Sequence, residues 1–147
     1  MAGRNTDTTG VHVWLVLMKA QQALLKYALR SIAGSSLCFS DFAVLEVLLH
    51  RGPLPVNAVG ATVSLTSGPS TTAIDRLEKK GLVRRAPHAT DRRTKIVHLT
   101  DKGKSLISTG FRQHEADMEA VTSCLSASEK AVLINLLKKL GKTATAG

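Results

Sequence analysis

Two short β-like runs joined by a polar loop constrain the fold of this chain most. The runs are LVRRA and KIVHL, at residues 82–86 and 95–99, and the loop between them extends from Pro87 to Thr94. Short runs rich in β-branched residues and bounded by proline and polar residues are typical of a β-hairpin. The sequence therefore predicts a hairpin with a polar tip, preceded and followed by segments of a different kind.

Those other segments carry apolar residues at helical spacing. Capping signals bound them: Ser40 and Asp41 at the start of the second helix, Gly81 after the fourth and Ser126 before the last. The expected helices cover residues 11–33, 40–50, 54–65, 68–80, 101–121 and 127–142. The predicted fold class is mainly α, in the order α-α-α-α-β-β-α-α, within one domain over residues 1–147.

Two short helices, a turn between them and a hairpin behind them form the arrangement of a winged helix-turn-helix. A helix fits the major groove of B-DNA, which is roughly 12 Å wide, and a thin hairpin tip can reach the narrower minor groove beside it. We therefore expect a winged helix-turn-helix lobe over residues 39–103.

Positive charge is concentrated in the same region. The chain of 147 residues has a formal net charge of +9, from 20 Lys and Arg against 11 Asp and Glu. Between Arg76 and Lys104 ten basic residues stand against three acidic ones, a balance of +7. This excess favours an anionic partner such as nucleic acid or a membrane surface. The low aromatic content, 3%, argues against an RNA surface that stacks bases.

No motif in the sequence points to an enzyme. Neither GxGxxG nor GxxxxGK[ST] occurs, and no known pattern pairs a nucleophile with a base. The five histidines lack metal-ligand spacing, and Cys38 and Cys124 form no CxxC pair, so we expect no metal and no other cofactor. The longest early apolar run, Val13 to Met18, is far shorter than a membrane span. A cytoplasmic protein without a membrane partner is the expectation.

The segment Phe39–Gly103 resembles the multiple antibiotic resistance regulator (MarR) family of bacterial transcription factors. The most specific parts are DRLEKKGLVRR at residues 75–85, DRR at residues 91–93 and HLTDKG at residues 98–103. Each part alone is a weak signal, but the three at these distances are specific. The resemblance implies a DNA-binding regulator with a winged helix-turn-helix fold.

The resemblance also assigns DNA contacts, residue by residue. It makes residues 68–77 the recognition helix, with Thr71 where the family commonly has threonine. Arg93 matches the wing arginine that enters the minor groove, and Asp91 matches the acid that braces the wing by pairing with a nearby arginine. Thr72 stands where many members carry a basic residue, so base readout is expected to rest on hydroxyls. The full expected DNA-binding set is Ser67, Gly68, Ser70, Thr71, Thr72, Asp75, Arg76, Arg84, Asp91, Arg92, Arg93 and Lys95.

A homodimer and a small effector are further implications of the resemblance. The helices at 11–33 and 104–142 carry apolar stripes too wide for one small monomer to cover, which agrees with a role as dimerisation helices. A small aromatic or phenolic anion is expected between these helices and the DNA-binding lobe. The expected effector contacts are Met18, Gln22, Tyr27 and Phe42.

We interpret the chain as a homodimeric repressor that binds a pseudo-palindromic operator in double-stranded DNA and responds to a ligand. Two alternatives stay open. Cys38 precedes a helix N-terminus, an environment that can activate a thiol, so the regulator could instead sense oxidants. A winged helix can also serve as an RNA-binding or protein-interaction module, in which case residues 91–93 would form a self-paired surface turn.

Overall fold

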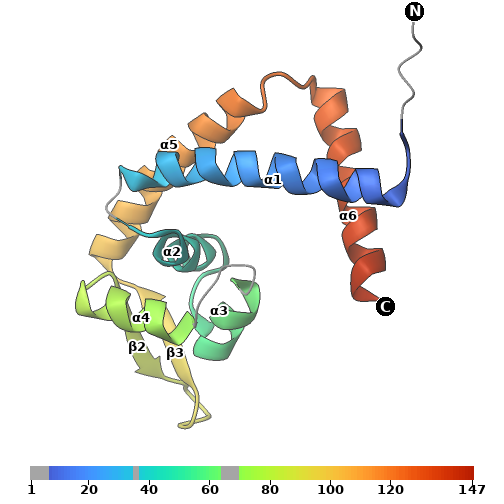
Figure 1. Cartoon of the computed structure of the whole chain (residues 1–147). Helices are drawn as coiled ribbons and strands as arrows, with labels where there is room; N and C mark the ends of the chain where they lie inside the picture. Colours follow the sequence, from blue (N-terminus) through green and yellow to red (C-terminus); the bar gives the residue numbers. More distant parts are fainter. Residues whose placement is uncertain (1–6, 35–36, 64–69) are drawn as a thin grey trace, which may run out of the picture. The chain divides into compact units, whose positions relative to one another are not determined.

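The computed structural model describes residues 7–34, 37–63 and 70–147, with the backbone alone at Ser70 (Figure 1). The chain divides into two compact units, Met1–His114 and Glu115–Gly147. The elements in chain order are α1 (Gly10–Ala33), α2 (Phe39–Arg51), β1 (Leu54–Pro55), α3 (Val56–Thr62), α4 (Ser70–Lys79), β2 (Val83–Pro87), β3 (Lys95–Leu99), α5 (Asp101–Val121) and α6 (Ala127–Thr145). The second unit contains the end of α5 and the whole of α6.

The long first helix is confirmed, and most of its apolar side chains are exposed. Thr9 caps its start by accepting a hydrogen bond from the backbone N–H of His12. Ile32, close to its end, is buried in the core of the first unit. The large apolar side chains of α1 that remain exposed are Val11, Val13, Trp14, Leu15, Val16, Leu24, Leu25 and Leu29.

The second helix, α2, supplies much of the core. It packs against α1, α3, α4 and β3 (Figure 1). Its buried apolar side chains are Phe42, Val44, Leu45 and Leu48. The prediction that Ser40 caps this helix is wrong: the helix already begins at Phe39, which packs against the core, and Cys38 is the N-cap without a side-chain hydrogen bond. Gly52, with a φ of 78°, ends the helix as expected.

The segment after Gly52 contains a strand that the sequence analysis missed. We expected a helix from Leu54, but Leu54 and Pro55 form β1, which pairs antiparallel with Val97 and Ile96 of β3. A proline disfavours helical backbone in the residue before it, which agrees with the extended Leu54, and α3 begins at Val56 with Pro55 as its N-cap. The strand therefore turns the expected hairpin into a three-stranded sheet of order β1-β3-β2.

The hairpin itself is confirmed. β2 and β3 pair antiparallel from Val83 opposite Leu99 to Pro87 opposite Lys95. The side chains of Val83 and Val97 are buried, so the sheet contributes to the same core as α2. The polar loop 88–94 is left at the free end of the hairpin.

The fourth helix, α4, buries the apolar side that the sequence predicts. Ala73, Ile74 and Leu77 are at most 1% exposed. Gly81, with a φ of 72°, ends the helix region, and the N–H groups of Gly81 and Leu82 donate to the carbonyls of Glu78 and Leu77. This pair of bonds is the Schellman arrangement, which needs a residue in the left-handed region at the glycine position. The connection from α4 to β2 is thereby fixed.

The start of α5 packs directly on that connection. Thr100 donates its hydroxyl hydrogen to the carbonyl of Gly81 at 2.6 Å and accepts from the backbone N–H of Gly103 at 3.0 Å. Gly103 is buried, and a Cβ there would lie 1.9 Å from the carbonyl oxygen of Leu82. The glycine of the HLTDKG run is therefore required for the close backbone contact between α5 and Leu82, in the connection before β2.

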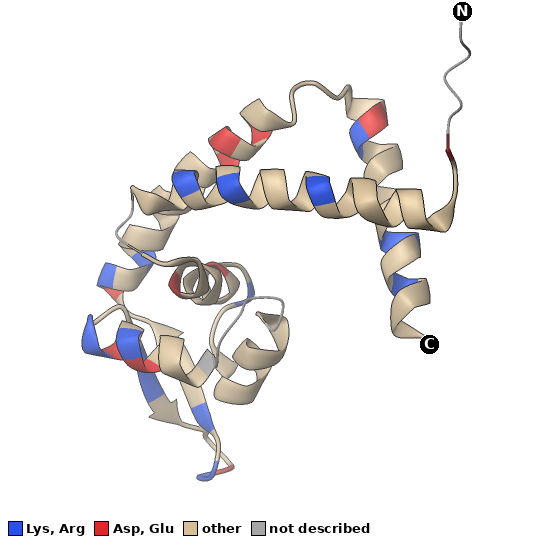
Figure 2. Cartoon of the chain, in the orientation of Figure 1, with Lys and Arg blue, Asp and Glu red and all other residues tan. Residues whose placement is uncertain are grey.

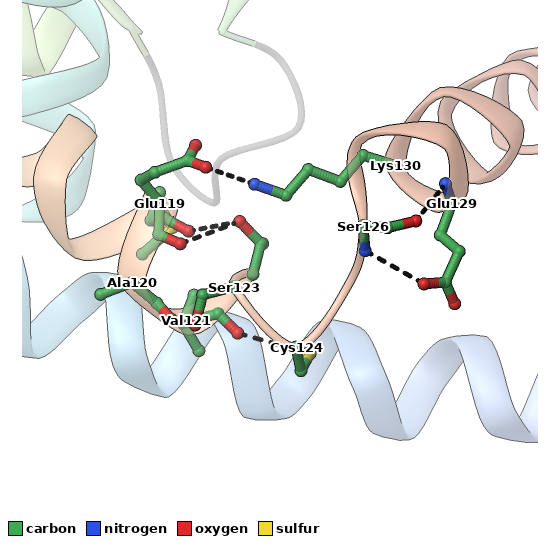
Figure 3. Close-up of polar contacts among 10 residues, drawn as sticks. Glu119, Ala120, Val121, Ser123, Cys124, Ser126, Glu129 and Lys130 are labelled. Atoms are coloured by element: carbon green, nitrogen blue, oxygen red, sulfur yellow. Dashed lines mark hydrogen bonds and ion pairs between the residues drawn. The ribbon is translucent and has the colours of Figure 1, made fainter.

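The second unit consists of the end of α5, the turn after it and α6 (Figure 3). Ser126 and Glu129 form a reciprocal capping box at the start of α6, which confirms the cap predicted at Ser126. The backbone N–H of Ser126 donates to the carboxylate of Glu129 and lowers its pKa. Lys130 pairs with Glu119 across the turn. The exposed large apolar side chains of α6 are Val132, Leu133, Ile134, Leu136, Leu137 and Leu140.

We expect Gly103→Ala to destabilise the protein by about 1–3 kcal/mol, because the new methyl group forces the backbone of α5 away from that of Leu82. Urea unfolding at fixed protein concentration measures the change. Gly141→Ala is the matched control, since a Cβ at this α6 position meets no atom within 4 Å. It should be neutral or stabilising by about 0.5–1 kcal/mol. Equal effects of the two substitutions would contradict the close contact at Gly103.

Candidate DNA-binding surface

The outer side of α4 presents short polar side chains. Thr71 and Thr72 are exposed on the side opposite to the buried Ala73, Ile74 and Leu77. Ser67 and Gly68, also predicted to contact DNA, lie outside the described residues, and Ser70 is described by its backbone alone. Hydroxyls on an exposed helix face can donate and accept hydrogen bonds at the edges of bases.

An ion pair fastens α4 to α2. The Arg76 guanidinium donates two hydrogen bonds to Oδ1 of Asp41, at 2.7 Å from Nη2 and 3.3 Å from Nε. Asp41 is 1% exposed, and Lys80 approaches its other oxygen at 3.7 Å. The hydrogen bond to Asp41 raises the pKa of Arg76. Although the sequence analysis assigns Arg76 to DNA contact, its charge is used here to neutralise a buried carboxylate.

A second ion cluster joins α4 to the hairpin. Arg85 of β2 donates from Nη2 to Asp75 at 2.6 Å and from Nη1 to Glu78 at 3.0 Å. Burial lowers the pKa of Arg85, but the hydrogen bonds to Asp75 and Glu78 outweigh it and leave the pKa raised. The backbone N–H of Arg85 also donates to Glu78. Asp75, which we expected at the DNA, thus holds the helix and the hairpin in one arrangement.

The tip of the hairpin is ordered by hydrogen bonds within the loop. Asp91 accepts from the backbone N–H of Arg93 and from the hydroxyl of Thr94, both at 3.0 Å. The expected pairing of Asp91 with an arginine side chain is wrong for the described part of the chain, where no guanidinium lies within 4.0 Å of this carboxylate. Asp91 braces the wing through a local turn, because its side chain reaches the amide two residues ahead.

The basic side chains of α4 and the hairpin differ in their partners. Arg76 and Arg85 are bound to carboxylates. Four others are exposed, and within the described ranges their side chains make no hydrogen bond or ion pair: Arg84, Arg92, Arg93 and Lys95. Figure 2 shows the positive charge along α4, β2 and the tip of the hairpin. A helix face with hydroxyls beside a hairpin with unpaired cations matches the geometry of a major-groove reader with a wing.

Known proteins are similar to this chain in sequence. The MarR family model matches residues 40–95. The transcriptional regulator MhqR from Bacillus subtilis is 33% identical over 132 residues, which cover 90% of this chain and 91% of MhqR. The chain belongs to the MarR family. It is therefore a helix-turn-helix transcriptional regulator, in a family of regulators and not of enzymes.

Two solved structures agree in fold with this MarR-family regulator. A cysteine-to-serine mutant of MarR from E. coli, complexed with operator DNA, superposes with a TM-score of 0.78 over 88% of this chain and 94% of that chain, at 24% identity. BpsR from Bordetella bronchiseptica, whose DNA binding is regulated by 6-hydroxynicotinic acid, gives a TM-score of 0.77 over 88% and 98%, also at 24% identity. At this identity the likeness shows the fold alone.

A cleft of about 510 Å³ lies in the first unit of this MarR-family chain, among α1, α2 and α5. Its lining residues are Ser31, Ile32, Gly34, Phe42, Leu106, Thr109, Gly110 and Gln113. Of the four expected effector contacts, Phe42 is at this cleft. Met18, Gln22 and Tyr27 lie further towards the start of α1 and do not line it.

The thiol of Cys38 is exposed and lies 3.5 Å from Nη2 of Arg76. Cys124, the other cysteine, is in the turn before α6. Over residues 7–34, 37–63 and 70–147 no group of three or more His, Cys, Asp or Glu side chains is arranged to hold a metal ion. None of the described helices is long and apolar enough to cross a membrane.

The sequence did not predict that Asp41 and Arg85 hold α4 against its neighbours through ion pairs. Asp41 looked like an ordinary first-turn acid, and its partner Arg76 is 35 residues away. Arg85 had a signal that could have been used: successive residues of a strand point to opposite faces, so Arg84 and Arg85 cannot both face solvent equally. The structure leaves Arg84 exposed and half-buries Arg85.

We expect Arg76→Gln to cost more stability than Asp41→Asn. Loss of the guanidinium leaves a buried carboxylate with only Lys80 near it, and an unsatisfied buried acceptor costs about 1–3 kcal/mol. Asn at position 41 still accepts a hydrogen bond from an arginine that water also reaches, so the cost should stay below about 1 kcal/mol. Urea unfolding at one protein concentration compares the variants, with Arg92→Gln as the exposed control. Equal losses for both substitutions would refute a buried charge at Asp41.

Proposed function

We propose that this MarR-family protein is a homodimeric, ligand-responsive repressor that binds a pseudo-palindromic operator. The observation that carries the proposal is the division of its cations. Two arginines hold α4 in place, while the arginines of the hairpin tip keep their charge free for phosphates or for the minor groove. Operator binding would also account for the cytoplasmic location that the sequence favours.

In this proposal α4 enters the major groove with Thr71 and Thr72, and Arg93 enters the adjacent minor groove. Exposed Arg84, Arg92 and Lys95 contact phosphates, which carry affinity without sequence information. Ser67, Gly68 and Ser70 would lie at the start of the recognition helix. The operator complex of the E. coli MarR mutant, which has the same fold, supports this docking.

Dimerisation follows from the exposed apolar helices. Trp14 of α1 is 60% exposed and Leu136 of α6 is 58% exposed, and similar side chains surround each of them on its own helix. Soluble proteins rarely leave such continuous apolar faces uncovered. A second copy of the chain would cover them and relate two recognition helices by a two-fold axis, so that each meets a major groove.

The ligand in this proposal is a small aromatic or phenolic anion. The cleft beside Phe42 has apolar walls and a few polar groups, among them Thr109 and Gln113, as small-molecule sites commonly do. BpsR, whose DNA binding responds to 6-hydroxynicotinic acid, supports this class of ligand. Such a ligand releases DNA only to the extent that it binds the form unable to hold DNA more tightly.

Oxidation of Cys38 is the second candidate for regulation. The thiol is exposed, and it touches Arg76, which fastens the recognition helix to α2. Conversion of the thiol to a sulfenic acid would change the surroundings of that guanidinium. This switch would need no ligand.

On an operator selected from a random duplex pool, Arg93→Ala should weaken binding by about 1–3 kcal/mol without changing the preferred sequence. Thr71→Ala should change the sequence preference instead, because Thr71 faces the base edges. The selected site should be a pseudo-palindrome with half-sites about 10 bp apart. Glu119→Gln, in the second unit, is the control for general effects. Arg93→Ala protein that binds as wild type would remove the wing from the mechanism.

We expect salicylate-like anions to release the operator from both wild type and Cys38→Ser. Thr109→Phe should reduce the anion's affinity at least about tenfold, because the ring occupies the cleft. Ser105→Phe, one turn earlier on α5 and outside the cleft, is the matched control. Fluorescence anisotropy of labelled operator measures release. Release by peroxide alone, lost in Cys38→Ser, would replace the ligand mechanism with the thiol mechanism.

A further inference from the structure

One imidazole closes the tip of the wing. Nδ1 of His88 accepts hydrogen bonds from the backbone N–H groups of Thr90, at 3.2 Å, and Asp91, at 3.1 Å. The hydroxyl of Thr90 lies 3.2 Å from the same nitrogen. The side chain thus receives the amides two and three residues ahead, as Asn or Asp does in an Asx turn. These amides lie directly before the two arginines of the tip.

This geometry requires one protonation state of the ring. A nitrogen that accepts two N–H hydrogen bonds has no hydrogen of its own, so His88 must be neutral with its proton on Nε2. A proton added to Nδ1 would point at two amide donors and would end both bonds. The ring would then have to leave its position over the turn.

The rest of the loop depends on the same turn. The backbone N–H of His88 donates to the carbonyl of Thr94 at 3.0 Å, and that of Thr94 donates to the carbonyl of Asp91 at 3.2 Å. Asp91 in turn binds the amide of Arg93. His88 and Asp91 therefore act together to fix the direction in which Arg92 and Arg93 leave the hairpin.

No neighbouring charge holds the ring in either state. The charged groups of the loop and the adjoining strand end are Asp91, Arg92, Arg93 and Lys95. In the described part of the chain no carboxylate lies within 4.0 Å of the ring. The Asp91 carboxylate already accepts hydrogen bonds from the backbone N–H of Arg93 and the hydroxyl of Thr94. Protonation would therefore gain no ion pair to offset the two lost hydrogen bonds.

We propose that His88 is a positioning residue of the wing, which holds the tip arginines in the DNA-binding arrangement only while its imidazole is neutral. Acidification protonates Nδ1, opens the turn at residues 88–91 and weakens the contribution of the wing to DNA binding. Histidine is the side chain whose charge ordinarily changes between about pH 5 and pH 8, so a comparison of these two conditions tests the proposal. This inference rests on the proposed binding of operator DNA through the wing.

The first arm of the test uses the free protein. NMR of ¹⁵N-labelled histidine distinguishes the two neutral tautomers, and we expect the Nε2–H form of His88 at about pH 8. Protection of the Thr90 and Asp91 amides from hydrogen exchange, corrected for the intrinsic rate, should fall as the ring is protonated. A neutral ring with its proton on Nδ1, or protection that stays constant through its titration, would overturn the inference.

The second arm uses variants and the selected operator. His88→Asn places an oxygen where Nδ1 stands, so it keeps the acceptor but cannot titrate. His88→Ala removes the acceptor at every pH. Binding is compared at about pH 8 and pH 5.5 in about 0.3 M salt, which screens the attraction that the extra positive charge adds. The other four histidines are present in all three proteins.

Wild type should lose about threefold to tenfold more operator affinity on acidification than His88→Asn. At about pH 8, His88→Ala should bind more weakly by a similar factor and His88→Asn should bind as wild type. Parallel losses in wild type and His88→Asn would overturn the positioning role. Absence of operator binding in every protein at both pH values would overturn the proposed function, and the NMR arm would still decide whether His88 closes the tip.

Discussion

A buried carboxylate on α2 determines how the reading helix is presented. Apolar contacts of Ala73, Ile74 and Leu77 hold α4 to the core, but such contacts have no preferred direction. The two hydrogen bonds from Arg76 to Asp41 have a preferred direction, since a guanidinium binds a carboxylate in a fixed plane. Rotation of α4 about its axis would move Arg76 away and leave Asp41 of α2 without this partner. The side chains that face outward on α4 follow from this constraint.

A second set of hydrogen bonds extends the constraint to the hairpin. Arg85 belongs to β2 and binds Asp75 and Glu78 of α4, so hydrogen bonds join the helix and the hairpin into one candidate DNA-binding surface. The basic residues of the region therefore have two different roles. Cations with carboxylate partners set the geometry, and exposed cations such as Arg92 and Arg93 remain for a polyanion. The proposed role of His88 adds control over the direction of that second group.

Local patterns in the sequence predicted most of the elements. These patterns are short-range signals: helical spacing, the glycine at position 81 and the cap at Ser126. The structure confirms the helices that these signals mark. The strand β1 was missed because two residues carry no periodicity, and its pairing with β3 joins residues that are distant in the sequence. The hairpin was predicted from its two β-like runs, and the family resemblance supplied the roles of Asp91 and Arg93 at its tip.

The site was predicted less completely because its geometry depends on pairs of residues distant in sequence. Nothing near Asp41 announces that Arg76 will reach it, and a charged residue on a helix looks the same whether it contacts DNA or a neighbouring helix. Likewise, Asp91 and His88 bind backbone amides of their own loop, which no pattern of side chains reveals.

The two edge strands of the small sheet limit its pairing with other molecules. β1 has only two residues, one of them Pro55, and β2 ends at Pro87, so these edges offer few free amides to a strand from another molecule. In the proposed DNA complex, neighbouring copies along one duplex would therefore lie close together without pairing their sheets.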